Sequence, residues 1–146
     1  MPGEEERDRL QRLAYEAQVL QSQGRGVQEQ LGALSMTLVQ IQAASESLKV
    51  LKEKAGDSQC LVPIGAGAFA PASIGNGKVL VDIGAGVIVE KTYDEALSIL
   101  EARGKEMAKA QEEMQRSAKL VNTRLQALDA EARGLVEKMR GQAAPE

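Results

Sequence analysis

Two long stretches of the chain repeat apolar residues at alternating spacings of three and four positions. The first covers residues 10–48 and the second covers residues 97–139. An unbroken alternation of this kind is the heptad seam of a coiled coil. The seam positions that are not apolar are few: Gly24, Ser45, Gly104 and Gln111. The pattern therefore predicts two long helices, over residues 4–56 and 92–141.

The predicted helix ends carry their own signals. Acidic Glu4–Glu6 suits the positive end of a helix dipole, and Thr92 with Glu95 fits a capping box. Gly56 is expected to stop the first helix, and Gly141 with Pro145 the second.

The two seams have similar lengths, and the segment between them is short, which favours an antiparallel hairpin of helices. One register then joins apolar residues in nearly every layer: Leu48 with Leu100, Ile41 with Met107, Leu20 with Leu128 and Leu13 with Leu135. Its weaker layers are Gly24 with Leu125, Ser45 with Gly104 and Leu38 with Gln111. We interpret Gln111 as a residue that fixes register. Gly24, near Gly26, is either a tolerated small residue or a flexible joint in the first helix.

Residues 60–91 have a different character, because short apolar runs alternate there with glycines. The motif Ile-Gly-Ala-Gly occurs at 64–67 and again at 83–86. We expect two β-hairpins, with turns at Gly65, Gly67, Gly84 and Gly86 and with Pro63 and Pro71 at edges or bulges. The predicted strands are Cys60–Ile64, Ala68–Ile74, Lys78–Ile83 and Val87–Lys91.

The run Val79–Gly86 also resembles the start of a nucleotide-binding fingerprint. Such a site needs a helix directly after the glycine turn, because the helix N-terminus holds the phosphate. The β-branched residues after Gly86 favour a strand instead, and Val89 occupies the position of the third glycine. We therefore expect a hairpin turn, no cofactor and no enzymatic activity.

Composition narrows the function further. The chain of 146 residues has no histidine and one cysteine, so no disulfide forms within it, and Cys60 is expected to be a small, half-buried residue. A net charge of −3 predicts no nucleic-acid binding, and no apolar run is long enough to span a membrane. We expect a cytoplasmic protein without a catalytic or metal site.

Two small hairpins bury little surface by themselves, and their open edges and apolar faces need partners. We therefore expect the chain to oligomerise through the hairpins. The residues expected to form the assembly surface are Val62, Ile64, Phe69, Ile74, Val79, Val81, Ile83, Val87 and Val89.

The order helix, two hairpins, helix resembles the alpha subunit of archaeal prefoldin. The resemblance covers nearly the whole chain and is carried most specifically by VPIGAGAF at residues 62–69 and KVLVDIGAGVIVEKTYDEA at residues 78–96. It implies an α+β fold in which a long antiparallel coiled-coil hairpin carries two inserted β-hairpins. In the assembly these hairpins would join into a β-barrel platform. The Gly24/Gly26 pair departs from a uniformly rigid first helix.

The resemblance also implies an ATP-independent chaperone of two alpha and four beta subunits. Non-native client proteins would be held at the coiled-coil tips and passed to a group II chaperonin. The alternative is a structural coiled-coil scaffold with a defined folded partner. Tyr15, Val19 and Val136 lie off the seam and are the stronger client-binding candidates. The tip residues considered together are Leu10, Leu13, Tyr15, Val19, Leu20, Leu128, Leu135, Val136 and Met139.

Overall fold

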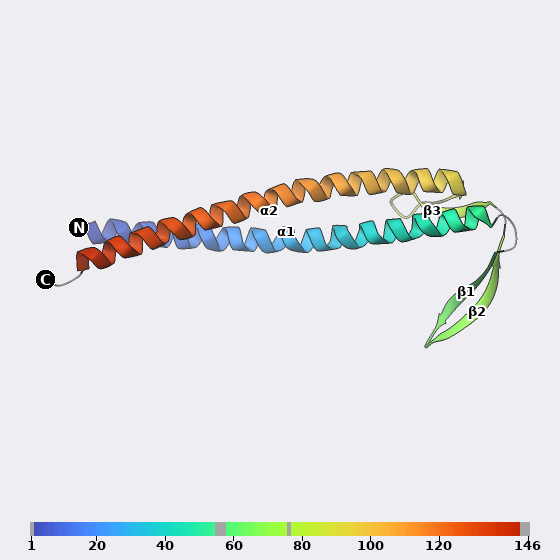
Figure 1. Cartoon of the computed structure of the whole chain (residues 1–146), viewed down its shortest axis with the longest axis horizontal. Helices are drawn as coiled ribbons and strands as arrows, with labels where there is room; N and C mark the ends of the chain where they lie inside the picture. Colours follow the sequence, from blue (N-terminus) through green and yellow to red (C-terminus); the bar gives the residue numbers. More distant parts are fainter. Residues whose placement is uncertain (1, 55–57, 76, 144–146) are drawn as a thin grey trace. The chain divides into compact units, whose positions relative to one another are not determined.

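The computed structural model describes residues 2–54, 58–75 and 77–143 (Figure 1). Along the chain, one long helix precedes two β-hairpins and a second long helix follows them. The predicted helix stops at Gly56 and Pro145 fall outside the described residues. The order is α1 (Pro2–Glu53), β1 (Ser58–Gly65), β2 (Ala68–Ile74), β3 (Lys78–Asp82), β4 (Ile88–Thr92) and α2 (Tyr93–Ala143). This confirms the predicted fold class.

Both helices continue through glycines that could have bent or ended them. α1 is helical at Gly24 and Gly26, and α2 extends past Gly141, which was wrongly expected to end it. A glycine inside a helix costs about 1 kcal/mol relative to alanine but keeps its backbone hydrogen bonds. One glycine at these positions therefore weakens the helix without ending it.

The start of α2 is capped as predicted, in one of the two halves of the capping box. The Glu95 backbone N–H donates a hydrogen bond to Thr92 Oγ1 over 3.2 Å. The Glu95 carboxylate lies 3.7 Å from Nζ of Lys91, which belongs to β4. Thr92 thus satisfies a backbone donor that the first turn leaves without a helical partner.

The chain divides into two compact units. The end unit comprises Met1–Ser35 and Lys109–Glu146, and the hairpin unit comprises Met36–Ala108. In the end unit the helices pack with Leu128 only 2% exposed and Leu13 also buried. Ion pairs flank this seam, including Arg124 Nε with Glu16 Oε1 at 2.9 Å and Arg9 with Glu131.

The helix register differs from the predicted one by about one helical turn. A Cβ placed on Gly24 would lie 3.5 Å from Val121 Cγ1, whereas the predicted partner was Leu125. In the hairpin unit, a Cβ on Gly104 would lie 3.7 Å from Ile41, not beside Ser45. Each seam side chain fits into a hole between residues of the facing helix, so layers one turn apart both join apolar residues. Apolar matching alone therefore did not select the register.

The hairpins form two separate antiparallel sheets, β1 with β2 and β3 with β4. Cys60 faces Ala72 in the first sheet, and Val81 faces Val89 in the second. The register shifts between Pro63 and Gly65, so of the two expected positions, an edge or a bulge, Pro63 lies next to an irregularity of the ladder. Because proline has no N–H to donate, a break in the ladder at that point loses little. Cys60 is half-buried, as expected.

The two Gly-Ala-Gly motifs adopt the same backbone conformation. The φ angles of Gly65, Ala66 and Gly67 are 129°, 51° and 80°, and those of residues 84–86 are 119°, 52° and 75°. The Val87 N–H donates to the Gly84 carbonyl oxygen over 3.0 Å, which closes a two-residue turn at Ala85-Gly86. Strand β4 follows, so no helix N-terminus is available for a phosphate. This confirms the motif as a hairpin turn.

Candidate functional site

The end unit exposes the apolar residues that were predicted to lie off the seam. Tyr15 is 71% exposed, and Val19 and Val136 are 39% and 38% exposed. Tyr15 and Val19 are one helical turn apart on α1, so their side chains are neighbours on its surface. Apolar side chains in this position are available to a partner without any change in the helix pair.

The predicted tip residues on the seam are less accessible. Leu13 and Leu128 are buried, and the others are half-buried: Leu10, Leu20, Leu135 and Met139. Leu10, Leu13 and Leu128 nonetheless line a shallow surface groove of about 560 Å³. The same groove is lined by Ala14, Ala17, Gln21, Leu125, Gln126, Asp129 and Ala132. The structure therefore brings part of the predicted set together in a mainly apolar concavity.

Small side chains create this groove. Ala17 and Ala132 are both seam residues, and both line it. Where both helices place alanine on the seam, the packed side chains leave a hollow that larger residues would fill. Both alanines fit the apolar seam pattern, and their small size is the signal in the sequence that points to the groove.

Some charged residues of the two helices form ion pairs across the seam. The Glu16 carboxylate accepts a hydrogen bond from Arg124 Nε at 2.9 Å, and this bond raises the pKa of Arg124 above its usual value. These pairs are exposed and add little stability. They leave the groove itself with one charged lining residue, Asp129.

Glu6 is a buried charge, although its place beside Glu4 and Glu5 predicted only an acidic helix start. It lies on the outward continuation of the α1 heptad and is 8% exposed. Lys138 Nζ lies 3.3 Å from Glu6 Oε1, whereas Oε2 is buried without a hydrogen-bond partner among the described residues. The seam thus ends on a carboxylate with one oxygen unsatisfied.

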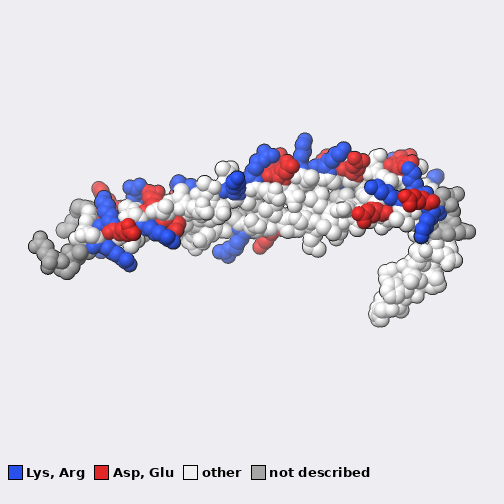
Figure 2. Space-filling view, in the orientation of Figure 1, with Lys and Arg blue, Asp and Glu red and all other residues white. Residues whose placement is uncertain are grey.

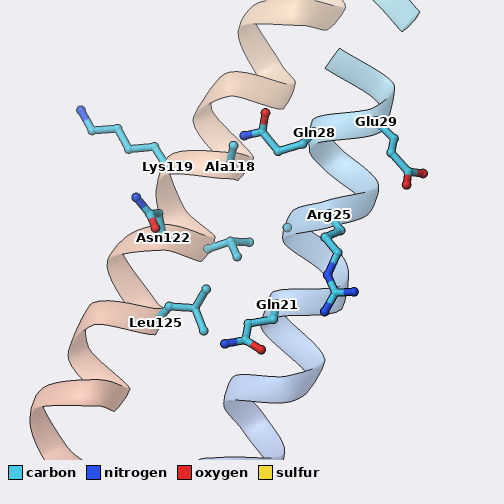
Figure 3. A pocket seen from close by; sticks show the side chains of 10 residues that line it. Gln21, Arg25, Gln28, Glu29, Ala118, Lys119, Asn122 and Leu125 are labelled. Carbon is cyan, nitrogen blue, oxygen red and sulfur yellow. The ribbon is translucent and has the colours of Figure 1, made fainter. Parts of the chain in front are cut away.

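A second groove of the end unit opens beside Gly24 and has a volume of about 780 Å³ (Figure 3). Its lining combines apolar seam residues with uncharged amides and a few charges. The residues are Gln21, Gly24, Arg25, Gln28, Glu29, Ala118, Lys119, Val121, Asn122 and Leu125. The predictions assigned no site here, although the missing side chain at Gly24 was visible in the heptad.

The hairpins expose many of the residues predicted for assembly. Five of these are exposed: Val62, Ile64, Phe69, Ile83 and Val87. The other four are half-buried: Ile74, Val79, Val81 and Val89. Leu61, Leu80 and Ile88 were left out of the predicted set, yet Leu80 is 72% exposed and the other two are also largely exposed. Both faces of the hairpins therefore carry accessible apolar side chains.

The first hairpin is uncharged throughout, since residues 58–77 include no Asp, Glu, Lys or Arg. In Figure 2 it stands out as a white segment, whereas the helices carry blue and red side chains. Apolar faces without charges are typical of surfaces that become buried in assemblies.

The second hairpin is fixed at its turn by Asp82, the last residue of β3. Asp82 Oδ1 accepts a hydrogen bond from the Gly84 backbone N–H at 2.8 Å. The Asp82 carbonyl oxygen accepts another from Arg103 of α2. An Asp that bonds the backbone two residues on stabilises a turn. These contacts hold the hairpin turn against the first turns of α2.

No group of three or more metal-ligating side chains occurs within residues 2–54, 58–75 and 77–143. Within the same described ranges, neither helix has a stretch long and apolar enough to cross a membrane.

Two long helices with two apolar β-hairpins between them in the chain define a class of coiled-coil proteins with inserted hairpins. A family model described as "Prefoldin subunit" matches residues 20–138, and the chain belongs to the Prefoldin family. It is thus a subunit of the prefoldin class of molecular chaperones.

Curated relatives from archaea support this assignment. Prefoldin subunit alpha 1 of Thermococcus kodakarensis is 39% identical over 103 residues, which cover 70% of each chain. Prefoldin subunit alpha of Methanosarcina barkeri is 32% identical over 130 residues, or 86% of this chain and 90% of the relative. The cryo-EM structure of filamentous PFD from Methanocaldococcus jannaschii has the same fold. Its TM-score is 0.69 at 24% identity, with 81% of this chain and 98% of that chain covered.

Proposed function

We propose that the chain is an alpha-type subunit that holds non-native proteins at the free ends of its helices, without ATP and without catalysis. It assembles through its hairpins with beta-type subunits, two alpha with four beta. It then passes its clients to a group II chaperonin in the cytoplasm. The relatives named as alpha subunits support the subunit type.

The exposed apolar surface of the end unit carries this proposal. Tyr15 offers a large, 71% exposed ring close to the N-terminus, and Val19 extends the same face. The apolar groove lined by Leu10, Leu13 and Leu128 lies in the same unit. Each contact with an unfolded chain is weak, but several arms that bind one client together give avidity without sequence specificity.

The exposed hairpins support assembly as the second part of the function. A two-stranded sheet is marginally stable in water, and each hairpin leaves two edges open. Ile64 and Phe69 on the first hairpin and Leu80 and Ile88 on the second are largely exposed. Partner subunits would pair the edges and cover these side chains.

The test replaces Tyr15, Val19 and Val136 together by Ser and measures suppression of aggregation of a thermally unfolding protein. The full chain is used in complex with a beta-type partner. We expect the wild-type complex to protect the client and the triple variant to lose about tenfold in potency, the effect of removing apolar contacts of about 1.4 kcal/mol. Light scattering should show an unchanged complex, because these residues lie outside the hairpins.

Leu120→Ser is the matched control. Leu120 is also 71% exposed, and it lies on α2 of the same unit but far from the helix ends in sequence. It should retain wild-type potency. If the control and the triple variant lost equal potency, client binding would not be centred on the helix ends. A wild-type complex that protects no client would favour the scaffold function instead.

A further inference from the structure

We propose that the groove beside Gly24 is a second client site, which binds one extended segment of a non-native polypeptide through its backbone and one apolar side chain. The inference rests on the proposed holding function. It adds a site between residues 21–29 of α1 and 118–125 of α2, away from the ends of the helices. It also gives Gly24 a role other than that of a joint.

The floor of the groove is apolar and lacks one side chain. Gly24 occupies a seam position that elsewhere in α1 is mainly filled by leucine, valine or isoleucine. Val121 and Leu125 face the vacated space from α2 and line the groove together with Ala118. A hollow of about 780 Å³ with this floor can receive an apolar side chain of a bound segment.

The rim of the groove carries three carboxamides. Figure 3 shows Gln21 and Gln28 extending from α1 towards α2, with Asn122 on the facing helix. None of the three side chains hydrogen-bonds to another residue in the described part of the chain. A carboxamide both donates and accepts, so it can bond either a peptide N–H or a peptide C=O.

This chemistry favours an unfolded segment over a folded partner. A helix or sheet already pairs its own backbone groups, whereas an extended non-native chain presents unpaired N–H and C=O groups. Carboxamides that bond backbone read no sequence. The charged lining residues are of both signs, Arg25 and Lys119 against Glu29, so the groove selects no client charge.

Gly26 separates this role from helix flexibility. A Cβ at Gly26 would meet nothing within 4 Å, and Gly26 does not line the groove. Alanine at either position stiffens α1 equally, by about 1 kcal/mol of helix propensity. Only substitution at Gly24 also fills the groove, since its Cβ would be in ordinary contact with Val121.

The test measures binding of a fluorescent, uncharged 12-residue peptide of Leu, Ser and Gly by anisotropy. The assembled complex carries the Tyr15, Val19 and Val136 to Ser substitutions, so that the helix ends contribute little. We expect Gly24→Leu to weaken binding about tenfold, the effect of one lost apolar contact, and Gly24→Ala to weaken it less. Gly26→Ala should bind as its parent does. Methylation of alternate backbone nitrogens removes N–H donors from the peptide. The methylated peptide should bind the parent more weakly than the unmethylated one does, whereas Gly24→Leu should bind both peptides equally.

Two results would overturn the proposal: equal losses in Gly24→Ala and Gly26→Ala, which indicate a joint, or no loss in Gly24→Leu. Complexes that associate through this face, detected as a mass increase in the parent that Gly24→Leu abolishes, would assign the groove to a second copy. Failure of the holding function gives a different result, because the complex with intact helix ends would then not suppress aggregation at all.

Discussion

Ala66 and Ala85 are the two described residues other than glycine with positive φ, at 51° and 52°. An L-residue in this left-handed region pays roughly 1 kcal/mol in steric strain, and asparagine tolerates it better because its side chain bonds locally. Each alanine is the first central residue of a two-residue hairpin turn, where Asn-Gly is the preferred pair.

We therefore expect Ala66→Asn and Ala85→Asn to stabilise their hairpins by about 0.5–1 kcal/mol each. Hydrogen exchange of the strand amides in the assembled complex measures the effect, since isolated hairpins are marginal. Ala68→Asn is the control, because Ala68 begins β2 and asparagine is unfavourable in strands. Equal protection in all three variants would contradict strain at the turns.

Glu6 gives a second prediction at this scale. Burying the Glu6 carboxylate, which has one unpaired oxygen, carries a desolvation cost. The ion pair with the exposed Lys138 offsets this cost only in part. Glu6→Leu should raise the stability of the end unit by about 1 kcal/mol, because an apolar residue continues the seam without desolvating a charge. Thermal unfolding followed by circular dichroism detects this change.

The comparison for Glu6 is Glu5→Leu, which removes the same charge from an exposed neighbour. It should leave the melting temperature nearly unchanged. A loss of stability in Glu6→Leu would instead show that the ion pair with Lys138 is net stabilising.

At the scale of elements, the first turn of α2 depends on a single hydroxyl, because Thr92 caps it. Thr92→Ala removes the acceptor of the Glu95 N–H and should destabilise the first turn of α2 by about 1 kcal/mol. Faster hydrogen exchange at Glu95 and Ala96 would report it. Thr123→Ala makes the same chemical change within α2, where the hydroxyl only bonds the Lys119 carbonyl. There alanine should protect the helix slightly, because it has the higher helix propensity.

The elements could be predicted from local pattern because each obeys its own period. The heptads predicted both helices. The repeated Gly-Ala-Gly turns predicted β2 with the bounds that it has in the structure, Ala68–Ile74. Register could not be predicted, since Gly24 can face Val121 or Leu125 with apolar neighbours in either case. Strand alternation likewise shows that Leu80 and Val81 lie on opposite faces, but not which face is covered. The burial of Glu6 and the grooves depend on contacts between distant residues, which no local pattern contains.

At the scale of the whole molecule, the helices and the first hairpin have surfaces of different kinds, to which we have proposed two separate functions. The helices carry charges, many of them in exposed ion pairs such as Lys105 with Glu101 and Arg133 with Asp129. The first hairpin has no charge over residues 58–77 and exposes Leu61, Ile64 and Phe69. Assembly that is driven by burial of such side chains depends on apolar area, whereas attraction between charges is screened by salt.

The assembly of the chain with its partner subunits should therefore persist from about 0.1 M to about 1 M NaCl, over which the screening length falls to roughly 3 Å. Light scattering at both salt concentrations measures the mass of the complex. Ile64→Asp together with Leu80→Asp should dissociate it, because each buries an unpaired charge at a subunit contact. Met36→Asp, at a similarly exposed apolar residue of α1, should leave the mass unchanged. A complex that falls apart at high salt would place the decisive subunit contacts on the charged helices, and the hairpins would then be only part of the interface.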